Sequence, residues 1–394
     1  MKINRRHFLL SSLGVGSLNL SNSNANDKFL NNVRLGNTDI IMPEIGYGSS
    51  STSDEDIVKY AFNRGIRYFD TAESYHGGDS EVSIGNALSS VRHEIIIGSK
   101  TKAKTYENKK DFMLSLEASL KRLRTDYIDI YFNHAVNSIA RLQNTEWWEF
   151  IDKAKEQGKI RYSGVSGHGS NLADCLEYCI DRNLVDVILS AFSFAQDPKF
   201  LEKLRHTFHF VAINPRLPEV LRKAKNKGIG VIAMKTLAGA RLNDMRPYED
   251  NNLTYSQAAI KWSLNTRFAD AAIISMTSES LIDELAMFDS NNINQVKSYN
   301  LLEKYFSLNS KNICPPGCDI CNNVCPNDVN IPDVMRSKMY ALDYKNPRKA
   351  LISYSQIANN ASDCLSCSGE PCLHKCGYDL DIKNLNNFTH KLLS

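Results

Sequence analysis

Three features are scarce in this sequence, and each scarcity excludes a class of protein. No block of Lys or Arg stands out, and a formal net charge of +3 is spread over 394 residues, which argues against a nucleic-acid partner. No apolar run is long enough to cross a bilayer. Only Cys175 and Cys179 precede residue 314, so no disulfide scaffold is expected in the first 300 residues. These two cysteines, four apart on a predicted helix, are expected to be buried packing thiols.

The N-terminus has the parts of a cleavable export signal. Arg5 and Arg6 are paired, a short apolar run broken by Ser and Gly extends to Leu20, and small residues follow to Ala25. This order is typical of a twin-arginine signal. We therefore predict that residues 1–25 are removed and that the mature protein acts in the periplasm. The alternative is a frayed, basic N-terminus without a targeting role.

Eight strand-like patterns alternate with eight helical patterns. The strand-like patterns lie at Ile45–Gly48, Arg67–Thr71, Glu94–Ser99, Tyr127–His134, Tyr162–Ser166, Val185–Phe192, Gly230–Lys235 and Ala271–Met276. The helical patterns lie at 54–64, 79–90, 111–123, 145–157, 171–182, 217–227, 254–266 and 278–288. Eight such units predict an α/β protein with a (β/α)₈ TIM barrel. An open doubly wound sheet is the alternative, but no Gly-x-Gly-x-x-Gly loop follows the first strand.

The pattern changes near residue 289. The predicted domains are the signal at 1–25, the barrel at 26–290, a linker helix at 291–312 and a cysteine-rich domain at 313–394. Within the last domain, 331–344 and 347–358 are predicted to be two short helices.

Four ionisable residues are expected at the carboxyl ends of barrel strands, where such folds gather their functional groups. They are Asp70, Tyr75, Lys100 and His134. Reduction of a carbonyl needs a hydride at carbon and a proton at the developing alkoxide. A tyrosine can supply that proton if an ammonium, held by an aspartate, lowers its pKa. A neutral imidazole can orient the carbonyl.

The segments around these residues resemble the aldo-keto reductase family. They are Tyr68–Glu81 (YFDTAESYHGGDSE), Ile97–Lys100 (IGSK), Tyr127–His134 (YIDIYFNH), Gly158–Ser166 (GKIRYSGVS) and the opening Arg34–Thr38 (RLGNT). The likeness extends from about Val33 to Phe288. It implies Tyr75 as proton donor, Lys100 and Asp70 as its tuning pair, and His134 as the carbonyl-orienting residue.

The resemblance also implies a nicotinamide cofactor, NADP(H) or NAD(H), at the barrel mouth. Its implied contacts are Gly48, Ser166, Met234, Leu237, Ser275, Thr277 and Ser278. Three departures from the family pattern predict weakened cofactor contacts. The usual Ser-Asn is Ser166-Gly167, the usual Gln of the sixth strand is replaced near Leu189–Ala191, and residues 275–284 contain no Lys or Arg for a 2′-phosphate.

The C-terminal cysteines form two runs with iron–sulfur spacing. The runs are Cys314-x₃-Cys318-x₂-Cys321-x₃-Cys325-Pro326 and Cys364-x₂-Cys367-x₄-Cys372-x₃-Cys376. They resemble a ferredoxin-type domain with two [4Fe–4S] clusters, in which the fourth Cys of each run ligates the other run's cluster. An iron–sulfur branch of the aldo-keto reductases carries such an extension. Two structural zinc sites or four disulfides are the alternatives.

Two functions remain open at this stage. One is an NAD(P)H-dependent oxidoreductase that reduces a small aldehyde or ketone and is linked to the clusters. The other is an exported electron-transfer or partner-binding protein whose barrel is a scaffold. The expected partners are a small carbonyl substrate and a redox partner protein.

Overall fold

Eight parallel strands form one closed barrel. The computed structural model describes residues 30–169, 171–197, 214, 216–238, 244–250, 253–309, 320–343, 346–376 and 380–394. The strand order around the barrel is β10-β3-β4-β5-β6-β7-β8-β9. The strands are β3 (Ile45–Gly48), β4 (Tyr68–Asp70), β5 (Ile96–Thr101), β6 (Ile128–Asn133), β7 (Ile160–Gly167), β8 (Val187–Ala191), β9 (Gly230–Met234) and β10 (Ala271–Ser275). The predicted TIM barrel is confirmed, and the open doubly wound sheet is excluded.

Helices surround the barrel on its outer face. They are α1 (Glu55–Asn63), α2 (Asp79–Leu88), α3 (Lys109–Leu123), α4 (Ile139–Leu142), α5 (Thr145–Glu156), α6 (Leu172–Asp181), α8 (Leu217–Asn226), α9 (Tyr255–Asn265) and α10 (Glu279–Ala286). The eight predicted helical segments are all present with small shifts at their ends. For example, α3 begins at Lys109 because Asn108 caps it, accepting hydrogen bonds from the backbone N–H groups of Lys110 and Asp111. Strand β5 begins at Ile96, after the 3₁₀ segment η2 (Ser89–Glu94).

The barrel has an outer and an inner apolar layer. The outer layer packs strands against helices and includes Cys175 and Cys179 of α6, which are buried as predicted. The inner layer contains Tyr68, Ile130 and Phe132. Because side chains alternate along a strand, Asp70 and Lys100 are expected on the inward face of the barrel, at the ends where β4 and β5 finish.

A hairpin closes the amino-terminal end of the barrel. It comprises β1 (Asn32–Arg34) and β2 (Ile41–Pro43), and its Leu35, Ile40 and Met42 are buried with the inner layer. Gly36 lies in the turn with φ +54°, and a Cβ there would stand 2.3 Å from the backbone nitrogen of Gly230. A side chain at this position would push the hairpin off the barrel.

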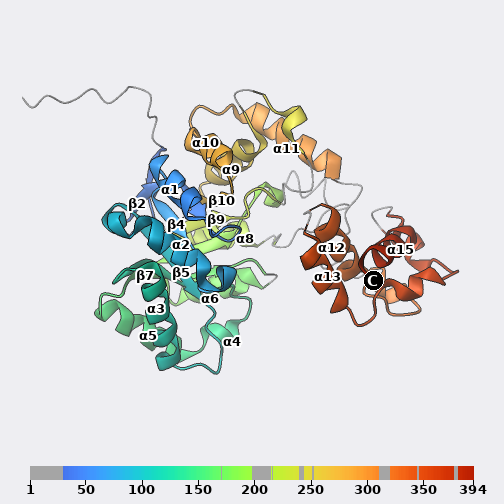
Figure 1. Ribbon diagram of the computed structural model, residues 1–394, viewed down its shortest axis with the longest axis horizontal. Helices are drawn as coiled ribbons and strands as arrows, with labels where there is room; N and C mark the ends of the chain where they lie inside the picture. The colour runs from blue at the N-terminus through green and yellow to red at the C-terminus, as the bar shows by residue number, and fades with distance from the viewer. Residues whose placement is uncertain are drawn as a thin grey trace, which may run out of the picture.

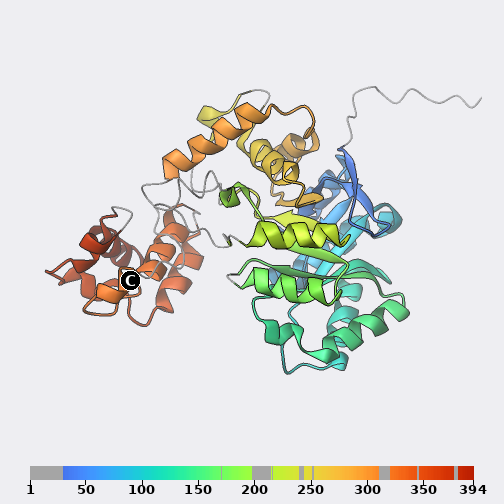
Figure 2. The same ribbon diagram turned by 180° about the vertical axis from the view of Figure 1, so that it is seen from behind.

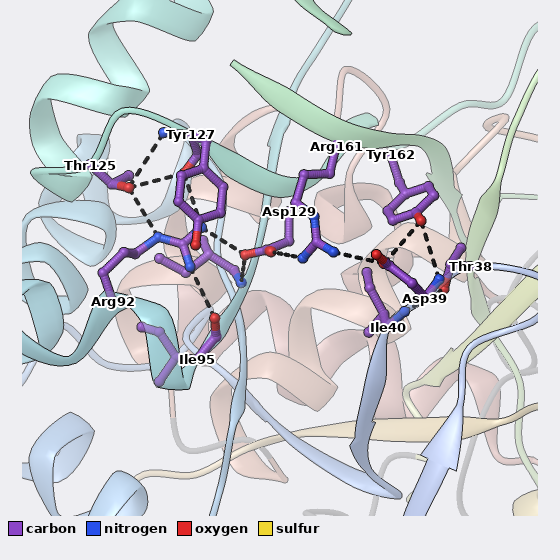
Figure 3. A network of polar contacts seen from close by, with 11 residues as sticks. Thr38, Asp39, Ile40, Arg92, Ile95, Thr125, Tyr127, Asp129, Arg161 and Tyr162 are labelled. Carbon is purple, nitrogen blue, oxygen red and sulfur yellow. Dashed lines mark hydrogen bonds and ion pairs between the residues drawn. The ribbon is translucent and has the colours of Figure 1, made fainter. Parts of the chain in front are cut away.

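A buried carboxylate ties this end together (Figure 3). Asp129 accepts hydrogen bonds at 2.7 Å from both Arg92 and Arg161 and at 2.9 Å from the Ile97 backbone N–H. Arg161 also reaches Asp39 on the hairpin at 2.7 Å. The network lies at the end of the barrel opposite the predicted active site, so its role is structural.

A further helix, α11 (Gln295–Asn309), packs against α9. Its Leu302, Tyr305 and Phe306 are buried with Tyr255, and the Tyr305 hydroxyl donates to the carbonyl of Ala238 at 2.8 Å. The segment predicted as a linker helix therefore also has contacts with the barrel's outer layer. The predicted domain boundaries themselves stay a prediction.

The C-terminal region forms its own small helical core, drawn in red tones in Figures 1 and 2. Its helices are α12 (Ile331–Leu342), α13 (Pro347–Ser355), α14 (Pro371–Lys375) and α15 (Ile382–Leu393), with the 3₁₀ segments η6 (Asn322–Val324) and η7 (Ala361–Leu365). Helices α12 and α13 match the two predicted short helices. In the described part of the chain no helix is long and apolar enough to span a membrane.

Candidate active site and cysteine pocket

Lys100 and Asp70 form a buried ion pair. The Lys100 Nζ lies 2.5 Å from Asp70 Oδ1 and donates to the carbonyl of Thr71 at 2.5 Å. The other carboxylate oxygen of Asp70 accepts a hydrogen bond of 3.3 Å from the Tyr68 hydroxyl. Burial raises the pKa of Asp70, and the Lys100 ammonium works in the opposite direction. The pairing fixes the ammonium at the carboxyl end of β5.

Tyr75 lies next to this ammonium. It opens the 3₁₀ segment η1 (Tyr75–Gly78), which follows β4, and the Lys100 Nζ is 5.0 Å from the centre of its ring. Burial raises the pKa of Tyr75, and the positive charge of Lys100 lowers it. The net direction is upward, which corrects the expectation of a lowered pKa, because loss of water around the phenol outweighs the ammonium.

His134, which directly follows β6, faces Tyr75. The two rings meet edge to face, with centroids 5.6 Å apart and an interplanar angle of 80°. Burial, followed by the charges of Lys100 and Lys102, lowers the pKa of His134 to about 3. The imidazole is therefore neutral at pH 7, as a carbonyl-orienting group requires. Within the described residues, its buried Nδ1 has no hydrogen-bond partner.

Arg141 of α4 holds the loop that carries His134 through hydrogen bonds. This guanidinium donates to the His134 carbonyl, to the carbonyls of Ala103 and Ala135, and to the Asn133 side chain, at 2.7–2.9 Å. Sequence reasoning missed Arg141, because its partners are mainly backbone carbonyls.

His168 was also missed. It directly follows β7, and burial lowers its pKa, with Lys235 and Lys102 acting in the same direction. Its buried Nδ1 has no hydrogen-bond partner among the described residues. A signal was present in the sequence: His168 stands two positions after Ser166, at the end of a predicted strand.

The seven predicted cofactor contacts share one end of the barrel. Gly48, Met234 and Ser275 are the last residues of β3, β9 and β10, and Ser166 is the penultimate residue of β7. The other three, Leu237, Thr277 and Ser278, lie in the loops that follow β9 and β10.

Two local contacts describe this end in more detail. A Cβ on Gly48 would lie 3.2 Å from the Ile274 backbone, so glycine allows the ends of β3 and β10 to pack closely. The Ser275 and Ser50 hydroxyl groups are 3.1 Å apart, which joins the ends of β10 and β3 by a hydrogen bond. The carboxyl ends of β3 and β10 are thus closely packed at Gly48 and carry the hydroxyl groups of Ser50 and Ser275.

The predicted phosphate segment carries acids rather than cations. Ser278 caps α10, accepting a hydrogen bond from the Leu281 backbone N–H, and Glu279 follows it. Arg64, which directly follows the neighbouring α1, has its Nε 2.7 Å from Asp283 Oδ1, so its charge is already paired. The weak 2′-phosphate site inferred from the sequence stays a prediction.

Comparisons with known proteins identify the barrel. A family model described as the aldo/keto reductase family matches residues 44–300. The chain belongs to the aldo/keto reductase family. It is accordingly an oxidoreductase of the NAD(P)H-dependent kind that acts on carbonyl compounds.

Individual relatives match over the same region. An L-galactose dehydrogenase of Arabidopsis thaliana is 27% identical over 293 residues, which cover 64% of this chain and 85% of the relative. The methylglyoxal reductase YeaE of Escherichia coli is 32% identical over 136 residues, 32% of this chain and 46% of that protein. The solved aldo-keto reductase AKR11C1 from Bacillus halodurans, in its holo form, aligns with a TM-score of 0.54 and 21% identity, covering 69% of this chain and 96% of that one. This last likeness concerns the fold alone.

Four cysteines of the C-terminal region line one pocket. They are Cys325 from the first run and Cys364, Cys367 and Cys372 from the second. Cys325, Cys364, Cys367, Cys372 and Cys376 form no disulfide within the described part of the chain, and Cys314 and Cys318 lie outside the described residues. Among the described residues, no three His, Cys, Asp or Glu side chains converge on a point suited to one metal ion. The four cysteines therefore share a pocket but do not form a site for a single metal ion within the described residues.

Proposed function

We propose that the chain reduces a small aldehyde or ketone with Tyr75 as the proton donor, and that two iron–sulfur clusters in its C-terminal domain serve the same redox chemistry. The observation that carries the first part is the position of Lys100, which touches the Asp70 carboxylate and stands over the Tyr75 ring. The Asp70 carboxylate, the Lys100 ammonium and the Tyr75 phenol thus meet beside the neutral imidazole of His134.

Each of these side chains has a distinct part in the reaction. When bound, NAD(P)H supplies the hydride. His134, being neutral, can donate an N–H to the substrate oxygen and hold the carbonyl in place. Tyr75 gives its phenolic proton to the oxygen as negative charge develops there. Lys100 stabilises the phenolate that remains, and Asp70 keeps the ammonium in position.

The raised pKa of Tyr75 suits this role. A phenol that stays protonated at neutral pH is ready to act as an acid, whereas an already ionised one is not. Lys100 then offsets part of the energy of phenolate formation during the step itself. The relatives named for L-galactose and methylglyoxal support a small carbonyl compound as the substrate class.

The cysteine pocket supports the iron–sulfur part of the proposal. Cys325 lies with Cys364, Cys367 and Cys372, which is the crossed grouping expected when the fourth cysteine of one run joins the other run's cluster. A pocket lined by four cysteines that do not converge on one metal-sized point suits a cluster, which occupies volume, better than one tetrahedral zinc ion with Zn–S bonds of about 2.3 Å. The remaining ligands proposed are Cys314, Cys318, Cys321 and Cys376.

The export of the protein remains part of the same proposal. Arg5, Arg6 and the apolar run after them lie outside the described residues, so their support is the sequence pattern alone. Twin-arginine export carries folded proteins, which suits a chain that receives clusters and a dinucleotide before it leaves the cytoplasm. The proposed location is the periplasm.

One assay tests the catalytic proposal. Protein purified without air is mixed with NADH or NADPH and a panel of small aldehydes and ketones, and nucleotide oxidation is followed. Wild type and the control Tyr106→Phe, a change at an exposed loop tyrosine, should oxidise the nucleotide when a carbonyl substrate is added, and Tyr75→Phe should not. Equal rates in all three proteins would overturn the proposal. Absence of nucleotide binding together with reversible cluster reduction would instead favour an electron-transfer protein with a scaffold barrel.

A further inference from the structure

One buried amide in the cysteine pocket has an unusual position. Asn386 of α15 lies in a stripe of buried residues with Ile382, Thr389 and Leu393, and none of its surface is exposed. An amide at such a place costs free energy unless its polar atoms are bonded. Its Oδ1 has no hydrogen-bond partner within the described residues.

The amide nitrogen of Asn386 points at a sulfur atom. Its Nδ2 donates to Cys364 Sγ at 3.4 Å, and both residues line the pocket that also holds Cys325, Cys367 and Cys372. A neutral thiol is only a weak hydrogen-bond acceptor. This contact alone would therefore offset little of the free energy that burying the amide costs. A thiolate bound to iron carries negative charge and is a far better acceptor.

The geometry points to Asn386 as the residue that sets the reduction potential of the cluster bound by Cys364. This inference rests on the proposed iron–sulfur function. Adding one electron to a cluster increases the negative charge on its sulfur ligands, and an N–H donor stabilises that charge. The hydrogen bond from Asn386 therefore favours the reduced cluster and raises its potential, without being a ligand itself.

A positive charge on the same helix would also favour the reduced cluster if it were unpaired. Lys383 lines the pocket one turn before Asn386, and its Nζ lies 2.6 Å from Glu370 Oε1. Because the ammonium is paired with a carboxylate, its net effect on the cluster is small. Asn386 is the neutral donor in direct contact with a sulfur, so its removal isolates the hydrogen bond.

The test uses the full-length protein isolated without air. Iron and sulfide analysis first establishes whether clusters are present, and their absence would sink the iron–sulfur proposal on which this inference depends. Electron paramagnetic resonance during a dithionite titration then gives the midpoint potential of each cluster. The variants are Asn386→Leu, which removes the donor at similar size, Asn386→Asp, which places a carboxylate there, and the control Asn387→Leu on the same helix.

In Asn386→Leu we expect one cluster to become about tenfold harder to reduce, a shift of about 59 mV for a one-electron couple. The other cluster, and both clusters of Asn387→Leu, should keep the wild-type potentials. Asn386→Asp should shift the same cluster further. Intact clusters with unchanged potentials in both Asn386 variants would overturn the inference. Loss of one cluster from both Asn386 variants, while Asn387→Leu keeps its two clusters, would also overturn the inference. Asn386 would then only support the structure of the pocket.

Discussion

The Lys100 ammonium is held 2.5 Å from the Asp70 carboxylate, and neither side chain is accessible to solvent. This pair has two consequences. It fixes a positive charge beside Tyr75. It also buries two opposite charges inside the barrel, and removing either one would leave the other buried and uncompensated, which destabilises the fold. Catalysis and stability are therefore coupled at this position, and variants can separate them.

Lys100→Met leaves the buried Asp70 without its cationic partner and with only the hydrogen bond from the Tyr68 hydroxyl. We expect the free energy of unfolding to fall by about 3–5 kcal/mol, as for other broken buried pairs. The double variant Asp70→Asn/Lys100→Met should recover most of that stability and remain inactive. Denaturant titration and the nucleotide oxidation assay measure the two effects. A single variant as stable as wild type would show that the pair is not buried as described.

His134 should give no pH inflection in catalysis near neutrality. Its pKa in the folded protein is about 3, so it stays neutral from pH 5 to 8. The pH profile of kcat/KM over that range should be the same in shape for wild type and His134→Gln, at a lower level in the variant. An inflection near pH 6.5 that disappears in His134→Gln would contradict the assignment.

The same pKa makes a prediction about stability. The unfolded chain carries a histidine pKa of about 6.5, so as the pH falls the unfolded state binds the proton first. The contribution of neutral His134 is therefore complete above pH 6.5 and decreases as the pH falls towards 3. Wild type should lose stability more steeply than His134→Gln between pH 6 and 4 in denaturant titrations. Parallel curves would argue against a buried neutral imidazole.

Asp129 should matter for stability alone. Asp129→Asn leaves Arg92 and Arg161 without their shared carboxylate (Figure 3). We expect a loss of about 3 kcal/mol in unfolding free energy, with unchanged kcat in the folded fraction. Asp56→Asn, at an exposed position of α1, is the control and should leave both quantities unchanged. A specific loss of kcat in Asp129→Asn would place this network in the active site.

The acidic start of α10 predicts weak selection between the two dinucleotides. Residues 275–284 supply hydroxyl groups from Ser275, Thr277 and Ser278 but no cation for a 2′-phosphate. The dissociation constants of NADPH and NADH should differ by less than about tenfold, or 1.4 kcal/mol. Calorimetry on the purified protein measures both. A preference for NADPH of a hundredfold or more would require a cation outside residues 275–284.

Sequence reasoning found the barrel and its strand ends because both follow from local periodicity. Alternating strands and helices imply parallel pairing, and parallel pairing brings Asp70, Lys100 and His134 to one end without further information. The direction of the Tyr75 pKa was wrong because the sequence indicates which charges are near but not how far water is excluded.

The residues that sequence reasoning missed depend on contacts between distant parts of the chain. Arg141 acts through backbone carbonyls, and His168 is recognisable only from its place two residues beyond Ser166. Asn386 lies 22 residues from Cys364, and only folding of α15 against η7 brings its amide to that sulfur. Nothing in its local sequence distinguishes it from Asn384 or Asn387.

Transfer of a labelled hydride in a single turnover tests the central claim most directly. NAD(P)H carrying deuterium at C4 is bound to the protein, a reactive small aldehyde is added, and deuterium in the alcohol product is measured by mass spectrometry. Wild type and Tyr106→Phe should label the product, and Tyr75→Phe should do so about 10²–10⁴ times more slowly with nucleotide binding unchanged. Labelling at the wild-type rate in Tyr75→Phe would contradict the account.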